Sequence, residues 1–197
     1  MNKSLGQAGM LRGLIGRLFG NIMARHNSPD NEWTIDLLHI EPNQRILEVG
    51  FGPGAAVESL MKRHPSVHVE GVDHSETMLQ AASSRNRNAI TEGNVSLQLS
   101  SIDQLPFAES CVDKAFAINC IYFWEKPVQG LVELHRVLKP GGLLGITVRD
   151  KARDAYQAFR PERLRELFVQ AGFNSVDVIH NDVSSHPLFC ALGVKSG

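Results

Sequence analysis

The chain has 197 residues, of which 43% are hydrophobic, and this length predicts one domain whose core needs no disulfide or structural metal. Twenty Lys and Arg against 21 Asp and Glu give a formal net charge of −1, which offers no general reason to expect a nucleic-acid partner. The apolar runs fall far short of the roughly 20 residues of a membrane span, and the three cysteines lack the paired spacing of a zinc site. We therefore expect a cytoplasmic globular protein without a metal.

The first segment differs from the rest in charge. Residues 1–29 contain basic side chains and no acid, and their apolar residues recur at three- and four-residue steps. We interpret residues 1–30 as a basic amphipathic cap helix docked on a domain that spans residues 31–197. A transit peptide or a helix lying on a membrane surface is the alternative reading of this composition. The run 27–30 then predicts the end of this helix and the cap of a second helix, from about residue 31 to residue 39.

Beyond residue 44, strand-like and helix-like patterns alternate. Strands are expected at 45–49, 67–72, 95–99, 115–119 and 143–148, and helices at 55–64, 75–84 and 128–138. Nearly continuous apolar strands that alternate with helices predict a mostly parallel sheet covered on both faces. The run Lys139-Pro140-Gly141-Gly142 is expected to break the last of these helices.

The end of the chain departs from this alternation. A helix is expected over 161–171, followed by strands at 173–180 and 188–194 with no room for a helix between them. These two strands must pair antiparallel, because a parallel crossover needs a dozen or more residues. The fold class is therefore α/β, with a Rossmann-like, doubly wound, seven-stranded sheet that ends in an antiparallel hairpin.

A glycine-rich turn follows the first strand. Gly50-Phe51-Gly52-Pro53-Gly54-Ala55 lets a ligand approach the backbone, next to the unpaired N–H groups of the following helix. The pattern satisfies both the dinucleotide fingerprint and a simpler turn with glycine at alternate positions. By itself this turn leaves the ligand open.

Two acids narrow the choice of ligand. Asp73 ends the second strand about 20 residues past the turn, where a carboxylate can accept both ribose hydroxyls. Glu48 ends the first strand, where it would repel a pyrophosphate and attract a cationic amino group. The two acids together favour a nucleoside with an amino-acid tail over NAD.

Four motifs in this order resemble the class I S-adenosylmethionine-dependent methyltransferases. They are Ile46-Leu-Glu-Val-Gly-Phe-Gly-Pro-Gly54, Gly71-Val-Asp73-His-Ser75-Glu-Thr-Met78, Leu105-Pro-Phe107 and Leu138-Lys-Pro-Gly-Gly142. The chain is most similar to the small-molecule branch, methyltransferase type 11, which includes the enzymes that methylate quinone precursors. The resemblance covers residues 35–195 and implies S-adenosylmethionine as cofactor and S-adenosylhomocysteine as product.

The resemblance also implies the contacts with the methionine and the ribose. Glu48 corresponds to the acid that orients the glycine turn and the methionine amino group. Asp73 corresponds to the acid that holds the ribose hydroxyls, and Asn119 to a position near the sulfonium. The glycine turn, with Gly50, Phe51, Gly52 and Gly54, is expected to line the methionine and the ribose.

For the adenine, the resemblance implies His74, Met78 and the backbone N–H of Ile102. Relatives commonly have Asp where this chain has Ser101, and that Asp bonds the adenine amino group. Ser101 is a shorter and neutral partner, so this departure puts the adenine contact in question.

The methyl acceptor is expected to lie beside the loop after the fourth strand. Tyr122 and Trp124 are candidate substrate contacts there, whereas Phe123 is expected in the core. We further hypothesise that the N-terminal helix closes over the pocket, with Phe19, Met23 and His26 facing a small, partly apolar acceptor. A phenol or alcohol acceptor would need a base, for which His26 and Tyr122 are the candidates.

Two other functions stay open from sequence alone. A protein that binds S-adenosylmethionine without transferring its methyl group would keep the same glycines and acids. An NAD-dependent oxidoreductase would share the glycine turn, although Glu48 and the terminal hairpin speak against it. The atom that is methylated, and the choice between monomer and homodimer, are not determined by the sequence.

Overall fold

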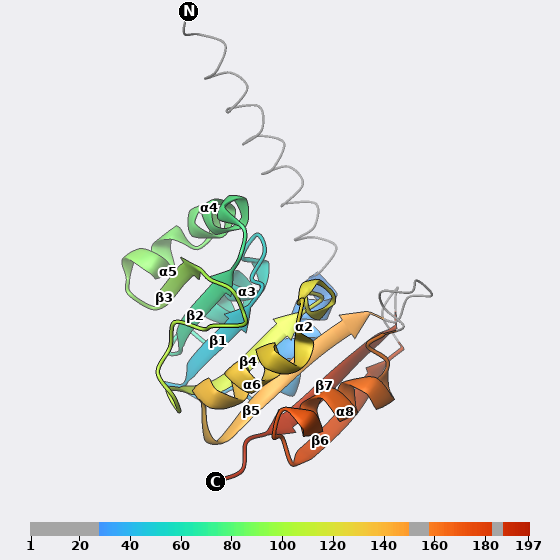
Figure 1. Ribbon diagram of the computed structural model, residues 1–197. Coiled ribbons are helices and arrows are strands. Elements are labelled where there is room, and N and C mark those ends of the chain that lie inside the picture. Colours follow the sequence, from blue (N-terminus) through green and yellow to red (C-terminus); the bar gives the residue numbers. More distant parts are fainter. Residues whose placement is uncertain (1–27, 150–157, 183–186) are drawn as a thin grey trace, which may run out of the picture.

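A seven-stranded sheet in the order β3-β2-β1-β4-β5-β7-β6 forms the centre of the computed structural model, which describes residues 28–149, 158–182 and 187–197 (Figure 1). The pairs among β1 to β5 are parallel, and β7 pairs antiparallel with both β5 and β6. The predicted fold class and the C-terminal hairpin are therefore confirmed.

The strands and helices mostly have the bounds that the sequence predicts. The strands are β1 (Arg45–Val49), β2 (His68–Asp73), β3 (Val95–Leu99), β4 (Val112–Ile118), β5 (Leu138–Arg149), β6 (Ser175–Asn181) and β7 (Leu188–Val194). The helices are α2 (Ser28–Leu37), α3 (Ala55–Arg63), α4 (Glu76–Arg85), α5 (Arg87–Thr91), α6 (Pro127–Val137) and α8 (Pro161–Gln170), and a 3₁₀ turn, η1, spans Ile121–Phe123.

Helices cover both faces of the sheet because its strands are apolar on both sides. In β1, Ile46 packs into the cluster under α2 and α3, whereas the next residue, Leu47, packs into the cluster under α6 and α8. Neighbouring residues of β4 alternate in the same way, Ala115 to one face and Phe116 to the other. Burying such residues drives folding at roughly 25 cal/mol per Å² of apolar surface. Figure 1 shows α6 and α8 together on one side of the sheet.

Three local predictions need correction. Helix α2 begins at Ser28 rather than near residue 31, and it ends before His39, whose φ of 46° is not helical. Helix α5 was not predicted; it follows α4 directly after Asn86, whose side-chain amide donates hydrogen bonds to Gly54 O and Ala82 O. Strand β5 begins at Leu138, because Leu138 pairs with Val112 before the register shifts.

The topology places a binding site at one edge of the sheet. Strand β1 lies between β2 and β4, so the chain winds outward from β1 in both directions. In such sheets, ligands bind at the carboxyl ends of the strands on either side of this switch point.

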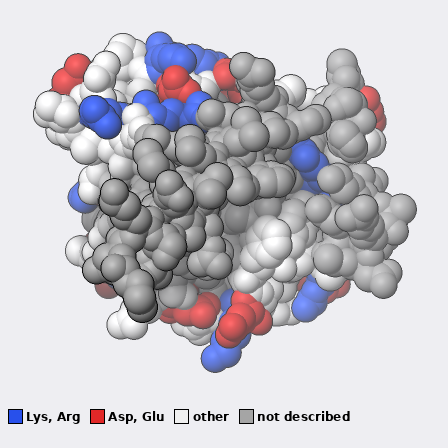
Figure 2. Space-filling model, turned by 90° about the horizontal axis from the view of Figure 1, so that it is seen from above, with Lys and Arg blue, Asp and Glu red and all other residues white. Residues whose placement is uncertain are grey.

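The described surface carries both signs of charge. On the part of the upper face that Figure 2 describes, Lys and Arg side chains lie beside Asp and Glu side chains rather than in one broad basic area. Among the described residues, no helix is both long and apolar enough to cross a membrane.

Candidate functional site

A cavity of about 700 Å³ opens at the carboxyl ends of β1, β2 and β4, within the size range of small-molecule sites. Its wall combines the turn after β1, the end of β2, the loop after β3, the segment after β4 and one residue of α2. The lining residues are Asn31, Glu48, Val49, Gly50, Phe51, Gly52, Pro53, Ala55, Ala56, Val72, Asp73, His74, Ser75, Met78, Ser100, Ser101, Ile102, Asp103, Ile118, Asn119, Cys120, Phe123, Trp124 and Glu125.

The glycine turn forms the floor of this cavity. Gly50 has a φ of 74°, and a Cβ there would lie 2.7 Å from Cys120 Sγ, so only glycine fits. The Gly50 N–H donates to Val72 O at 2.8 Å, which holds the turn against β2. Gly54, by contrast, begins α3 and packs against Ala82 of α4, outside the cavity lining. Its role in the structure is to let the two helices approach each other.

Asp73 is 7% exposed and is held by the backbone on both sides. Its Oδ2 accepts the Gly52 N–H at 2.9 Å, and its Oδ1 accepts the Ser75 N–H at 2.9 Å. Because each carboxylate oxygen has two lone pairs, both can accept a further hydrogen bond from a ligand. The carboxylate is therefore fixed in place without being saturated.

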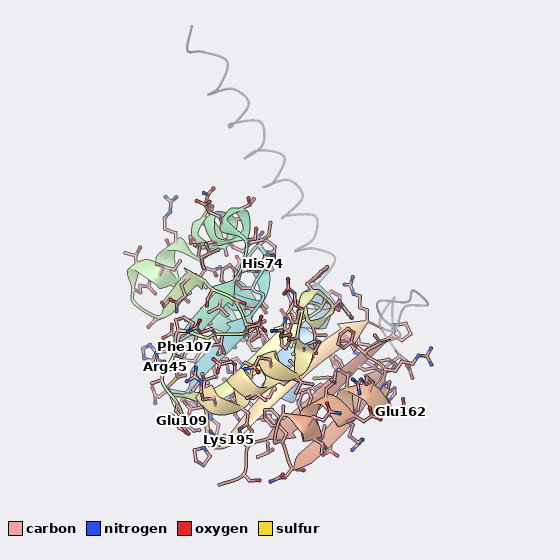
Figure 3. All side chains as sticks on the ribbon, viewed as in Figure 1. Arg45, His74, Phe107, Glu109, Glu162 and Lys195 are labelled. Atoms are coloured by element: carbon pink, nitrogen blue, oxygen red, sulfur yellow. The ribbon has the colours of Figure 1, made fainter. Side chains whose placement is uncertain are left out.

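His74 follows Asp73 at the rim of the cavity. Its side chain is 82% exposed, and its Nδ1 lies 3.7 Å from Asp73 Oδ1. Figure 3 shows His74 at the end of the sheet opposite Arg45 and Lys195. This position puts His74 where a bound ligand would meet solvent.

Glu48 is buried beneath the turn, with 3% of its surface exposed. Burial, and secondarily the charge of Asp73, raise the pKa of Glu48 to about 8, against the opposing effect of a hydrogen bond from the Val57 backbone. Near neutral pH the group therefore carries its proton in the absence of a ligand, and a cationic group beside it would favour its ionisation.

Three buried side-chain oxygens within the described residues lack a hydrogen-bond partner: Glu48 Oε2, Asp103 Oδ1 and Asn119 Oδ1. All three belong to residues that line the cavity. Buried polar atoms are nearly always paired in native proteins, and an unpaired one costs about 1–3 kcal/mol. Asp103 Oδ1 and Asn119 Oδ1 are acceptors, and Glu48 becomes an acceptor when it ionises, so a ligand that brings hydrogen-bond donors suits this site.

The charge of the lining agrees with such a ligand. Glu48, Asp73, Asp103 and Glu125 line the cavity, and no Lys or Arg is among its described lining residues. A pyrophosphate would meet several acidic side chains in this described lining, which suits a dinucleotide poorly. A ligand with amino groups or a positive charge suits it better.

Helix α2 closes one side of the site through a buried polar contact. Asp30 is 3% exposed, and its Oδ2 accepts both Asn119 Nδ2 and Arg149 Nε at 2.7 Å. These bonds join the start of α2 to the ends of β4 and β5. They also fix the amide of Asn119, whose φ of 54° places it in the left-handed region, and bring Asn31 into the lining. Sequence reasoning missed Asp30 and Asn31, which showed only as part of a helix cap.

The segment after β4 differs in part from the prediction. Asn119 and Trp124 line the cavity, but Tyr122 does not; its hydroxyl accepts the Arg149 N–H at 2.7 Å and its ring packs edge-on against Phe159. The prediction that Phe123 lies in the core is wrong, because its side chain is 75% exposed and lines the cavity. In a 3₁₀ turn, residues i and i+3 share a side, so Ile121 and Trp124 point inward and Phe123 points outward.

Cys120 is the cysteine that lines the cavity. Its thiol donates to Val49 O at 3.2 Å, and burial raises its pKa to about 12. The thiol therefore stays protonated at neutral pH and is a poor nucleophile. In the part of the chain that the structure describes, no cluster of three His, Cys, Asp or Glu residues could hold a metal ion.

The other predicted site residues fall into two groups. Six of them line the cavity: Phe51, Gly52, His74, Met78, Ser101 and Ile102. Phe19, Met23 and His26 lie outside the described residues, so the cap helix, the lid and the His26 base stay predictions.

Comparisons relate the chain to known proteins. Residues 47–146 match the family model described as "Methyltransferase domain". The chain is 34% identical over 183 residues to the methyltransferase YdaC of Bacillus subtilis (strain 168), which covers 89% of this chain and 97% of that protein. It is 32% identical over 120 residues to the ubiquinone/menaquinone biosynthesis C-methyltransferase UbiE of Geotalea daltonii, covering 57% of this chain and 50% of UbiE. A solved SAM-dependent methyltransferase from Aquifex aeolicus shares the fold, with a TM-score of 0.70 and 23% identity over 84% of this chain and 89% of that chain.

Proposed function

The chain belongs to the methyltransferase domain family, and we propose that this S-adenosylmethionine-dependent methyltransferase acts on a small, partly apolar metabolite. The observation that supports this proposal is the cavity, whose lining includes four acidic side chains and three buried side-chain oxygens without hydrogen-bond partners. S-adenosylmethionine supplies an activated methyl group on a sulfonium, and it also carries the amino and hydroxyl donors that this lining calls for.

The residues at the ends of β1 and β2 would hold the two ends of the cofactor. Glu48, with Oε2 unpaired, would take the methionine ammonium, directly or through water, and would ionise as it does so. Asp73 would accept the ribose hydroxyls while its backbone partners keep it in place. The turn from Gly50 to Gly52 would lie along the ligand, where side chains would prevent a close approach.

The acceptor would bind near the end of β4. Phe123 and Trp124 offer apolar surface there, and Asn119 offers an unpaired carbonyl oxygen. The cavity volume of about 700 Å³ is that of a small-molecule site, which supports a small acceptor. The contribution of the protein to the reaction is then to align acceptor and methyl group and to exclude water.

Calorimetric titration of the full chain with S-adenosylmethionine and S-adenosylhomocysteine tests the cofactor assignment. We expect micromolar binding of both ligands, and a loss of about a hundredfold or more in Asp73→Ala, because two charge-assisted hydrogen bonds to the ribose disappear. Asp177→Ala is the matched control, since Asp177 is exposed on β6, away from the cavity lining.

Binding that is equal in the wild type and in Asp73→Ala would show that the ribose is held elsewhere. No heat with either ligand would contradict the assignment of this cavity to the cofactor. After binding is established, release of S-adenosylhomocysteine with candidate small acceptors would identify the substrate.

A further inference from the structure

The end of α4 holds the glycine turn from outside the cavity. Arg85 Nε donates to Pro53 O at 2.9 Å. The next residue, Asn86, is 5% exposed, and its Nδ2 donates to Gly54 O at 3.0 Å. Pro53 lines the cavity, whereas Arg85 and Asn86 are not among the described lining residues. These two side chains therefore reach the turn from behind the surface that a ligand would meet.

The segment that leads into α4 holds the same turn from the cavity side. Asp73, at the end of β2, accepts the Gly52 N–H through Oδ2 at 2.9 Å. Before it, Val72 O accepts the Gly50 N–H at 2.8 Å. Because α4 follows β2 after a short loop, residues 72–86 hold the turn on both sides. The tip of the turn lies between the carboxylate of Asp73 and the guanidinium of Arg85.

Side-chain packing contributes little at this tip. A Cβ built on Gly52 would meet nothing within 4 Å, and Gly52 has a φ of 50°. The next residue, Pro53, has no N–H with which to stabilise the turn. The conformation of the tip therefore depends on its hydrogen bonds, among them the one to Asp73 and the one from Arg85.

An arginine suits this position because its guanidinium carries several donors in one plane. While Nε donates to Pro53 O, NH1 donates to Glu58 Oε2 on α3 at 3.1 Å. The Arg85 side chain is 23% exposed, so its contacts are partly shielded from water. One side chain thus links α4, α3 and the glycine turn.

We propose that Arg85 is a positioning residue for the cofactor. By holding the Pro53 carbonyl, it keeps the Gly52 N–H directed at Asp73 and the turn in the shape that receives the ligand. This inference rests on the proposed function, which places the ribose at Asp73. Because Arg85 acts through the turn, it should set the affinity for the cofactor and leave the rate of methyl transfer at saturating cofactor unchanged.

Two measurements on the full chain test this role. The first is the affinity for S-adenosylhomocysteine by calorimetry, and the second is hydrogen exchange of the Gly52 amide by NMR without ligand. Arg85→Met keeps an unbranched side chain and removes the donors. It should weaken binding about tenfold, the effect of losing one hydrogen bond from a charged donor, and it should accelerate exchange at Gly52.

Two variants separate this role from a structural one. Arg87→Met makes the same change at an exposed residue two positions further along. Glu58→Gln removes the ion pair with Arg85 but leaves the bond to Pro53 O in place. Both should keep the wild-type affinity and the wild-type exchange at Gly52. Amides of β6 and β7 report on the whole fold, so their exchange should stay unchanged in Arg85→Met.

Each outcome decides for or against this role. Weaker binding together with faster Gly52 exchange in Arg85→Met alone supports the inference. Unchanged affinity in Arg85→Met, or an equal loss in Glu58→Gln, overturns it and leaves the cofactor assignment intact. If the wild type binds neither S-adenosylmethionine nor S-adenosylhomocysteine, the proposed function fails. The exchange of Gly52, measured without ligand, then still decides whether Arg85 holds the turn.

Discussion

The two sides of the cavity are built in different ways. On the side of β1 and β2, the parts are close in the sequence and are held by the backbone, as when the Gly52 and Ser75 N–H groups hold Asp73. On the side of β4 and β5, the parts are far apart: Asp30 joins Asn119 across 89 residues and Arg149 across 119. The first side is a local motif, whereas the second exists only once the sheet and α2 have packed.

This difference matches the functions proposed for the two sides. The β1–β2 side would hold a cofactor, for which one fixed arrangement of a turn and two acids is enough. The β4–β5 side would face the acceptor, and its polar floor depends on one buried carboxylate. Altering the first side should therefore change cofactor affinity or local packing, whereas altering Asp30 should loosen contacts between several elements.

The same difference explains which parts of the site could be predicted from the sequence. The turn and the acids could be predicted because glycine at positive φ and a carboxylate at a strand end are local signals, and β3 and β7 have the predicted bounds. Asp30 and Asp103 could not be found, because their significance lies in which atoms they meet, or fail to meet, after folding. Phe123 was misplaced because apolar character alone does not reveal the direction that a 3₁₀ turn gives to each side chain.

The largest effect is expected at Gly54, at the end of the glycine turn on the β1–β2 side. In Gly54→Ala, the new Cβ would lie 2.6 Å from Asn86 Nδ2 and 2.9 Å from Ala82 Cα, at a φ of 75°. Left-handed strain and overpacking together should lower the free energy of unfolding by about 4 kcal/mol. Gly52→Ala is the matched control: its φ of 50° carries similar strain, but nothing lies within 4 Å, so a loss of only about 1 kcal/mol is expected. Equal losses in urea denaturation would show that helix packing at Gly54 is not tight.

The substitution Asp30→Ala tests the β4–β5 side, whose parts are far apart in the sequence. Removing this carboxylate takes away the one buried oxygen that accepts both Asn119 Nδ2 and Arg149 Nε. The free energy of unfolding should fall by about 3 kcal/mol. Asp36→Ala, on the same helix, removes an exposed ion pair with Arg63 and should cost at most about 1 kcal/mol. If both substitutions have the same small effect in denaturant titrations, the buried contact does not hold the two regions together.

The pH dependence of stability can distinguish a ligand-binding role of Glu48 from a structural one. Its pKa of about 8 in the folded chain exceeds the ordinary value of 4.5, so the folded state binds more protons than the unfolded state between these values. Stability of the wild type, without ligand, should therefore fall as pH rises through this window. Glu48→Gln has no carboxyl to ionise, so at pH 9 it should have a higher melting temperature than the wild type. The difference should be about 2–4 °C for each kcal/mol of unfolding free energy that the wild type loses.

The same substitution should weaken S-adenosylmethionine binding most at pH 8 and above, where the wild-type carboxylate is ionised and the ammonium would lose its counter-charge. For the wild type, affinity should increase with pH up to about 8. Glu92→Gln, at an exposed position in the same half of the chain, should show the melting behaviour of the wild type. If Glu48→Gln melts lower than the wild type at pH 9, the buried carboxylate stabilises the fold and is not held there for a ligand.

The smallest expected effect concerns the tyrosine of the acceptor side. Tyr122→Phe removes the acceptor of the Arg149 N–H and keeps the ring that packs on Phe159, so it should cost about 1 kcal/mol of unfolding free energy. Cofactor affinity should be unchanged, because Tyr122 does not line the cavity. Once an acceptor is identified, methyl transfer by Tyr122→Phe should stay within a fewfold of the wild type. A loss of transfer with unchanged thermal unfolding, together with a changed pH dependence of the rate, would instead indicate that the Tyr122 hydroxyl takes part in the reaction. In that case this side of the site would supply chemistry as well as shape.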